Sequence, residues 1–326
     1  MNCFEISLQP NTAKLSCYLQ QLSDELPGCS VRPAVLILPG GGYKTCSDRE
    51  AEPVALAYLH AGYNAFVLRY TTMGHDNARP AADIFPMAFA DAQAAMLYLH
   101  EQAETLHIDL KRIVAVGFSA GGNLAAALGT LAECKPAALV LGYASVDDDI
   151  AKSLGVAEPV MIDSVSAQTP PSFLFTTQAD SLVPSTNTLR FSLALAERKI
   201  PYEVHVFATG DHGLSLAEEH TGMAEPDVAQ WFPMSLRFLR NLWSGKNLVW
   251  SSAEQSGFSA NTRLDVLLAN PAAKAILASK MPALIPLLEQ NKIAVGLSLR
   301  RLAALSHDKI PAALVEEIDR ALAEQH

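Results

Sequence analysis

The strongest constraint on the fold is a buried strand that runs into a glycine-rich turn and then into a helix. A run of apolar, mostly β-branched residues at 113–116 precedes Gly117-Phe118-Ser119-Ala120-Gly121, and alanine and leucine dominate 124–128. The first run is typical of a fully buried strand, and the last segment favours a helix. Strand, sharp turn and helix form the setting that exposes a G-x-S-x-G serine at the edge of a sheet. Ser119 is therefore a candidate nucleophile, and the alternative is an ordinary glycine-rich turn in a doubly wound sheet.

The rest of the chain predicts strands that alternate with helices. An antiparallel hairpin is expected at 4–8 and 14–19, and further strands at 34–38, 65–68, 137–141, 172–176 and 202–207. Helices are expected at 50–61, 87–103, 188–198 and 228–242, and after Ser119 as far as Leu131. Residues 71–86 are expected to form a loop, and 146–171 a long mixed segment. Alternation of this kind predicts an α/β fold, with a mostly parallel sheet covered by helices on both faces.

The composition changes near residue 244. We predict an α/β catalytic domain over 1–245, a linker over 246–260 rich in Ser, Gly and Asn, and a small helical C-terminal module over 261–326. Short amphipathic segments interrupted by prolines fill the last part.

Charge and cysteine content exclude several classes of protein. The net charge of −10 argues against binding nucleic acid or an anionic membrane through a basic surface. The five cysteines include no C-x-x-C pair, so neither a disulfide framework nor a zinc site is expected. No metal motif and no G-x-G-x-x-G motif is present, so no cofactor is expected. The N-terminus lacks the features of a signal peptide, and no apolar run approaches the length of a membrane span, which favours a cytoplasmic protein.

Two further candidate catalytic side chains directly follow predicted strands. Asp180 lies just beyond strand 172–176, and His212 lies just beyond strand 202–207 in Gly-Asp-His-Gly. The chain order Ser119, Asp180, His212 is that of an α/β-hydrolase triad, in which the histidine is the general base and the aspartate orients it. The acidic residues 147–149 are the rivals of Asp180, and they read more simply as a solvated turn.

A glycine triplet follows the buried strand at 34–38. Acyl transfer needs backbone N–H groups aimed at the developing oxyanion, and glycine lets the backbone approach closely. We therefore assign Gly41, Gly42 and Ala120 as oxyanion-hole donors. The alternatives are a phosphate-binding turn or a plain loop, although a P-loop is excluded because Lys and Ser/Thr do not follow at its spacing.

Several segments resemble one enzyme family. They are Leu38-Pro-Gly-Gly-Gly-Tyr43, Ser47-Asp-Arg-Glu-Ala-Glu-Pro53, Gly62-Tyr-Asn-Ala-Phe-Val-Leu-Arg-Tyr70, Gly117-Phe-Ser-Ala-Gly-Gly-Asn-Leu124, Thr169-Pro-Pro-Ser-Phe-Leu-Phe175 and Asp211-His-Gly-Leu-Ser-Leu-Ala217. Together they resemble the α/β-hydrolase superfamily, and within it the bacterial acetyl esterase and feruloyl-esterase-like group associated with acetylated xylan. The resemblance implies a serine carboxylesterase without a cofactor.

The expected reaction is removal of small acyl groups, above all acetyl, from sugars or xylo-oligosaccharides, so the expected partner is a small-molecule or oligosaccharide ester. Tyr43, His75 and Met161 are candidates for substrate contacts, with packing within loops as the alternative. A peptidase of the prolyl-oligopeptidase type and a non-catalytic hydrolase-like binding module are the rival functions. The sequence leaves open whether the chain forms a homo-oligomer.

Overall fold

A computed structural model describes residues 1–11, 13–25, 29–74, 78–147, 155–156, 159–244, 258–290, 294–306 and 309–323. The chain divides into two compact units, Met1–Val249 and Trp250–His326. Residues 246–257 of the linker predicted at 246–260 lie outside the described residues.

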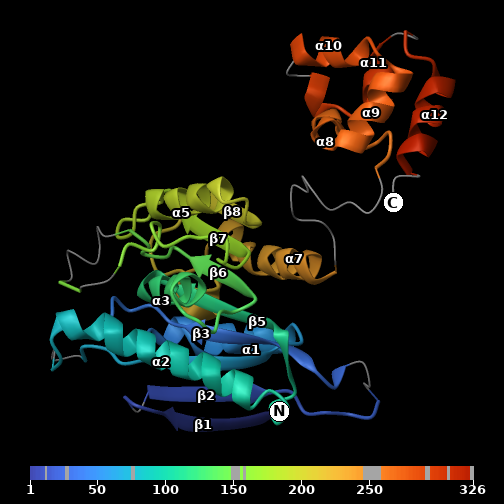
Figure 1. Ribbon diagram of the computed structural model, residues 1–326. Helices are drawn as coiled ribbons and strands as arrows, with labels where there is room; N and C mark the ends of the chain where they lie inside the picture. The colour runs from blue at the N-terminus through green and yellow to red at the C-terminus, as the bar shows by residue number, and fades with distance from the viewer. Residues whose placement is uncertain are drawn as a thin grey trace. The chain divides into compact units, whose positions relative to one another are not determined.

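One sheet runs through the first unit (Figure 1). Its strands are β1 (Asn2–Leu8), β2 (Ala13–Leu19), β3 (Arg32–Leu38), β4 (Asn64–Arg69), β5 (Ile108–Phe118), β6 (Ala138–Gly142), β7 (Ser172–Thr177) and β8 (Tyr202–Phe207). Their order in the sheet is β1-β2-β4-β3-β5-β6-β7-β8. Strands β1 and β2 form an antiparallel hairpin, and β2 also pairs antiparallel with β4. Every other pair of neighbouring strands, from β4–β3 to β7–β8, is parallel. The predicted opening hairpin and mostly parallel sheet are confirmed.

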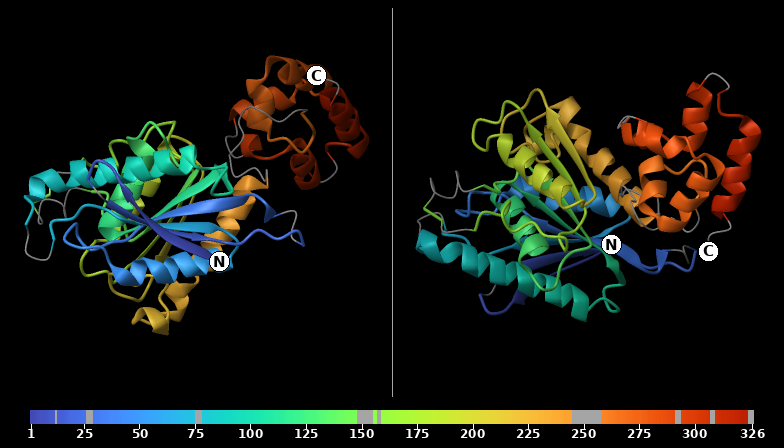
Figure 2. Two further views of the ribbon diagram at one scale, coloured as in Figure 1. Left: turned by 90° about the horizontal axis from the view of Figure 1, so that it is seen from below. Right: turned by 45° about the horizontal axis from the view of Figure 1, so that its top comes forward.

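Helices cover both faces of the sheet. They are α1 (Glu52–His60), α2 (Ala81–Glu101), α3 (Ser119–Thr130), α5 (Thr186–Glu197), α6 (Pro226–Ala229) and α7 (Trp231–Trp243), with short 3-10 helices η2 (Asp48–Glu50) and η3 (Glu219–Thr221). Successive side chains of a strand point to opposite faces. Leu36 of β3 therefore packs in the core with α2, α3 and α5, while its neighbour Val35 packs in the core with α1, α6 and α7. Figure 2 shows α1 and α2 on opposite faces of the sheet.

Two helix boundaries differ from the sequence-based expectation. Helix α2 begins at Ala81, so residues 81–86, expected to be loop, are helical and Pro86 lies inside the helix. Burial of Ile84 and Phe85 in the core offsets the hydrogen bond that the proline removes. The helix expected at 228–242 is two helices, because α6 ends at Ala229 and α7 begins at Trp231.

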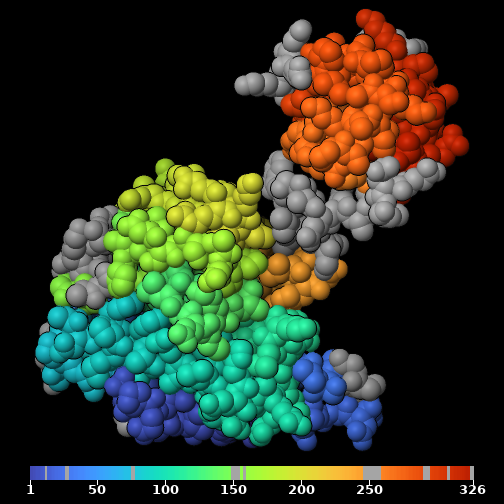
Figure 3. Space-filling model, in the orientation of Figure 1, coloured from blue at the N-terminus to red at the C-terminus, as the bar shows by residue number. Residues whose placement is uncertain are grey.

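The second unit is built from short helices around a core of its own. They are α8 (Leu264–Ala269), α9 (Pro271–Lys280), α10 (Leu284–Gln290), η4 (Ala294–Gly296), α11 (Leu299–Leu305) and α12 (Ala312–Ala323). Leu264, Leu277 and Ile318 are among its fully buried side chains. Figure 3 shows the surface of this unit in orange and red. The expected helical C-terminal region is confirmed. In the described parts of both units, no helix has the length and apolar character needed to cross a bilayer.

Candidate active site

Ser119 lies on a sharp turn between β5 and α3, in a backbone conformation that non-glycine residues rarely adopt. Its φ is 52°, and its exposed fraction is 8 %. The glycines on either side are required by close backbone approach. A Cβ on Gly121 would lie 2.0 Å from the Leu38 carbonyl oxygen, and one on Gly117 would lie 2.3 Å from the Gly121 carbonyl oxygen. The turn can therefore form only with glycine at both positions.

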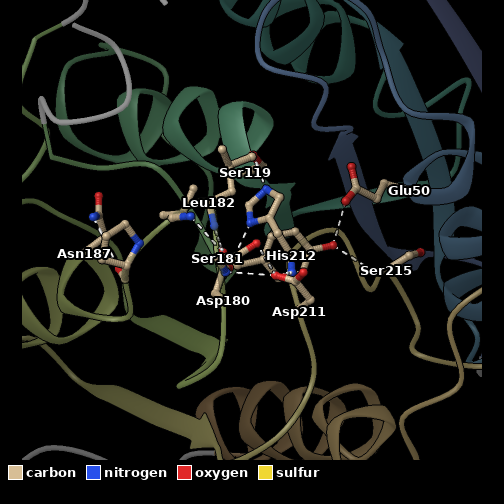
Figure 4. Close-up of polar contacts among 12 residues, drawn as sticks. Glu50, Ser119, Asp180, Ser181, Leu182, Asn187, Asp211, His212 and Ser215 are labelled. Atoms are coloured by element: carbon tan, nitrogen blue, oxygen red, sulfur yellow. Dashed lines mark hydrogen bonds and ion pairs between the residues drawn. The ribbon is translucent and has the colours of Figure 1, made fainter. Parts of the chain in front are cut away.

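Ser119, His212 and Asp180 are joined by hydrogen bonds above the carboxyl ends of three parallel strands (Figure 4). Ser119 Oγ lies 2.8 Å from His212 Nε2, and His212 Nδ1 lies 2.8 Å from Asp180 Oδ2. A carboxylate can only accept, so Nδ1–H donates to Asp180. Nε2 is then free to accept the Ser119 hydroxyl proton. The structure thus brings together the three residues that the sequence singled out.

Backbone donors fix the Asp180 carboxylate. Its Oδ1 accepts the N–H groups of Leu182 at 2.9 Å and Val183 at 2.8 Å, which leaves Oδ2 for the imidazole. The Asp180 side chain is 1 % exposed. The loop after β7 therefore presents this carboxylate in one orientation.

The other nearby carboxylates have different partners. Asp211 accepts the N–H and the hydroxyl of Ser181 and the N–H of His212; the hydrogen bonds from Ser181 first, then that from His212, lower the pKa of its carboxyl. Asp147, one of the rivals of Asp180, is paired with Arg190. Residues 148 and 149 lie outside the described residues. Asp180 is the carboxylate that contacts the His212 ring.

The loop after β3, Pro39–Tyr43, which we call the oxyanion loop, carries two of the three predicted oxyanion donors, Gly41 and Gly42. Gly41 and Gly42 have φ of 126° and 60°, and their N–H groups have no hydrogen-bond partner in the described part of the chain. Ala120 is the second residue of α3, so its N–H has no acceptor within the helix. The assignment of these three N–H groups as oxyanion donors stays a prediction. A Cβ on Gly40 would lie 3.0 Å from Ser119 Cβ, which places the loop against the nucleophile.

The three predicted substrate contacts have different surroundings. The Tyr43 ring is buried against Tyr70, and its hydroxyl donates to Asn123 Oδ1 at 2.8 Å. Met161 is fully buried, and its sulfur lies 3.8 Å from the hydroxyl of Thr130 at the far end of α3. The backbone N–H of Met161 donates to Val146 O at 3.0 Å, and the neighbouring Ser145 donates its N–H to Ser119 O at 3.2 Å. A substrate contact by Met161 stays a prediction. His75 lies outside the described residues.

Glu50 and Tyr143 are site residues that the sequence analysis did not single out. Glu50 is 2 % exposed; its carboxylate accepts the N–H of Gly40 at 2.7 Å and the hydroxyl proton of Tyr143 at 2.6 Å. Burial raises the pKa of both side chains. The sequence offered one signal for each residue: Glu50 lies in the Ser47–Pro53 segment, and Tyr143 closely follows a predicted strand.

No group of three or more His, Cys, Asp or Glu side chains suited to a metal ion occurs among the residues that the structure describes.

Comparison with solved structures decides the family. A crystal structure of MGS-M1, an α/β-hydrolase enzyme from a Medee basin deep-sea metagenome library, is 42 % identical, with a TM-score of 0.68 over 75 % of this chain and 98 % of that chain. The chain belongs to the α/β-hydrolase family. This hydrolase also resembles an acetyl ester-xyloside bifunctional hydrolase from Caldicellulosiruptor lactoaceticus, at 29 % identity and a TM-score of 0.62 over 72 % of this chain and 90 % of that chain.

Comparison of the sequence with family models and with curated proteins finds similar esterases and xylan-degrading enzymes. The BD-FAE family model matches residues 27–139. Endo-1,4-beta-xylanase B of Butyrivibrio fibrisolvens is 30 % identical over 58 % of this chain, and an acetylxylan esterase of Xylanibacter ruminicola is 25 % identical over 64 %. This α/β hydrolase spans 33 % of the first relative and 48 % of the second, that is, half or less of their lengths.

Proposed function

We propose that the protein is a serine carboxylesterase that removes acetyl groups from acetylated sugars or xylo-oligosaccharides. The observation that carries the proposal is the continuous hydrogen-bonded line from Ser119 through His212 to the buried Asp180. Names of relatives support the substrate class, since one is an acetylxylan esterase and another an acetyl ester-xyloside hydrolase.

In the proposed reaction, Ser119 Oγ bonds to the ester carbonyl carbon while its proton moves to His212 Nε2. Gly41, Gly42 and Ala120 donate N–H groups to the oxyanion, and each such donor is worth about 3 kcal/mol in related chemistry. When the tetrahedral intermediate collapses, the alcohol oxygen leaves with the proton from Nε2 and an acyl-enzyme remains. Water then attacks the acyl carbon by the same route, releases the carboxylic acid and returns the proton to Ser119.

The test compares the wild type with Ser119→Ala and with Ser192→Ala as a control. Ser192 donates its hydroxyl to Leu189 O within α5, so its loss should leave hydrolysis unchanged. We expect Ser119→Ala to lower kcat/KM for p-nitrophenyl acetate by at least about 10⁴-fold. Hydrolysis that survives this substitution would contradict the assignment.

The substrate class is tested separately. We expect acetate release from acetylated xylo-oligosaccharides to exceed cleavage of dipeptide amides. Faster amide cleavage would favour a peptidase of the prolyl-oligopeptidase type. Failure of a fluorophosphonate to label Ser119 in folded protein would favour a non-catalytic binding module.

A further inference from the structure

Glu50 is a buried carboxylate at the centre of a polar network that the proposed chemistry does not use. Its Oε2 accepts the N–H of Gly40, next to the glycines that supply the oxyanion donors, at 2.7 Å. Its Oε1 accepts the hydroxyl proton of Tyr143 at 2.6 Å. No ion pair joins Glu50 to a lysine or arginine within the described residues, so this carboxylate depends on hydrogen bonds.

Tyr143 extends the network to the loop that carries the histidine, residues 210–217, which we call the histidine loop. Its hydroxyl oxygen accepts the N–H of Ser215 at 2.8 Å, and its ring lies edge-on to the His212 ring with centroids 5.0 Å apart. The hydroxyl of Ser215 donates to the Arg49 carbonyl at 2.6 Å, which ties the histidine loop directly to the segment before Glu50. In the view of Figure 4, Glu50 and Ser215 lie together on one side of His212, while Asp180 lies on the other.

The directions of these hydrogen bonds are fixed by chemistry. The N–H groups of Gly40 and Ser215 can only donate. Tyr143 Oη therefore receives one proton from Ser215 and gives its own to Glu50, so both Glu50 oxygens are acceptors. This set suits a carboxylate, and a glutamine side chain could not satisfy both donors.

The Glu50 side chain is also coupled electrostatically to the histidine. Burial raises the pKa of the Glu50 carboxyl, and the hydrogen bonds from Tyr143 and Gly40 and the charge of a protonated His212 each oppose that rise. His212 becomes an imidazolium when it takes the proton of Ser119. Asp180 contacts the imidazole from one side, and the Tyr143 ring, whose hydroxyl donates to Glu50, packs against it.

We infer that Glu50 and Tyr143 form a buried positioning pair that holds the oxyanion loop and the histidine loop in one catalytic arrangement. Neither side chain touches the reacting atoms in this arrangement. The pair acts through Gly40 on the oxyanion donors and through Ser215 and the His212 ring on the base. This inference rests on the proposed esterase function.

The test uses the full-length variants Glu50→Gln and Tyr143→Phe and the double variant, with Glu52→Gln as the matched control. Glu52 is partly exposed and binds Arg69, so its substitution should leave kcat unchanged. We expect each single variant to lower kcat for p-nitrophenyl acetate by about 10- to 100-fold, because a buried donor loses its acceptor, with little change in KM. The double variant should lose about as much as the worse single variant, because both changes break one chain of contacts.

Equal kcat for the wild type and Glu50→Gln, or losses that multiply in the double variant, would overturn the inference. If Glu50→Gln does not fold, Tyr143→Phe decides alone, since it keeps the ring against His212 and removes only the hydroxyl. A rise in KM with kcat unchanged would also contradict it, because that pattern reports lost substrate binding. Absence of Ser119-dependent hydrolysis in the wild type would contradict the proposed function instead, so the two failures are distinguishable.

Discussion

Ser119 shows how a strained residue can be held in place by its neighbours. A left-handed backbone at a non-glycine residue costs on the order of 1–3 kcal/mol. The cost is offset because both sides of the turn are anchored: β5 is a central strand with fully buried residues, and α3 is buried along nearly its whole length. In this backbone conformation the Ser119 hydroxyl already lies within hydrogen-bond distance of His212, so the backbone does not have to move.

Asp180 can be tested at the same scale. We expect Asp180→Asn to lower kcat/KM by about 10⁴-fold, because an amide can donate to Nδ1 and so favour the wrong imidazole tautomer. Steady-state hydrolysis of p-nitrophenyl acetate measures the change. Asp109→Asn serves as the control, since Asp109 pairs with Arg112 at the opposite end of β5 from Ser119. A variant with Asp180→Asn that keeps wild-type activity would refute the assigned role.

The thiols of Cys17 and Cys46 should be unreactive toward alkylating reagents in the folded protein. Burial raises the pKa of Cys17 to about 12, and burial also raises that of Cys46 to about 12 although Arg69 opposes it. The thiolate is the reactive form, so both groups stay protonated as pH rises and ionise only near pH 12. A short pulse of iodoacetamide at about pH 8, read by peptide mass spectrometry, should label the exposed Cys3 and spare these two. Labelling of Cys46 as fast as Cys3 would contradict the prediction.

Among the elements, α2 departs most from the sequence-based expectation. Pro86 suggested a loop, yet the helix runs through it from Ala81. Local propensity was outweighed because Ile84 and Phe85 pack into the core, a contact that sequence alone does not reveal.

The proline gives a stability prediction for this helix. Pro86 is exposed, and it cannot donate to the Ala82 carbonyl as another residue would. We expect Pro86→Ala to raise the free energy of unfolding by about 1–2 kcal/mol, since the restored helical hydrogen bond exceeds the added freedom of the unfolded chain. Urea denaturation followed by circular dichroism measures it. Destabilisation by this substitution would show that the proline ring makes packing contacts that outweigh the missing bond.

At the scale of the whole molecule, the two compact units have separate cores. All residues assigned to the site lie in Met1–Val249. We expect a protein truncated after Val249 to keep the kcat and KM of the full chain for p-nitrophenyl acetate, because none of its catalytic contacts is removed. Loss of soluble expression or of activity on truncation would show that the C-terminal unit supports the hydrolase unit. The linker, the partners, the oligomeric state and the cytoplasmic location remain predictions.

The sequence by itself determined the α/β class, the opening hairpin and the order of Ser119, Asp180 and His212. Periodic apolar runs, and glycines at turns where the backbone must pass closely, are signals that can be read locally from the sequence. The carboxyl ends of parallel strands meet at one edge of the sheet, so residues that follow separate strands can be expected to lie together. Tertiary structure alone decided that α2 continues through Pro86 and that Met161 is fully buried. It also decided that Glu50 and Tyr143 meet between two loops. These outcomes depend on contacts between residues far apart in the chain, for which no local pattern exists.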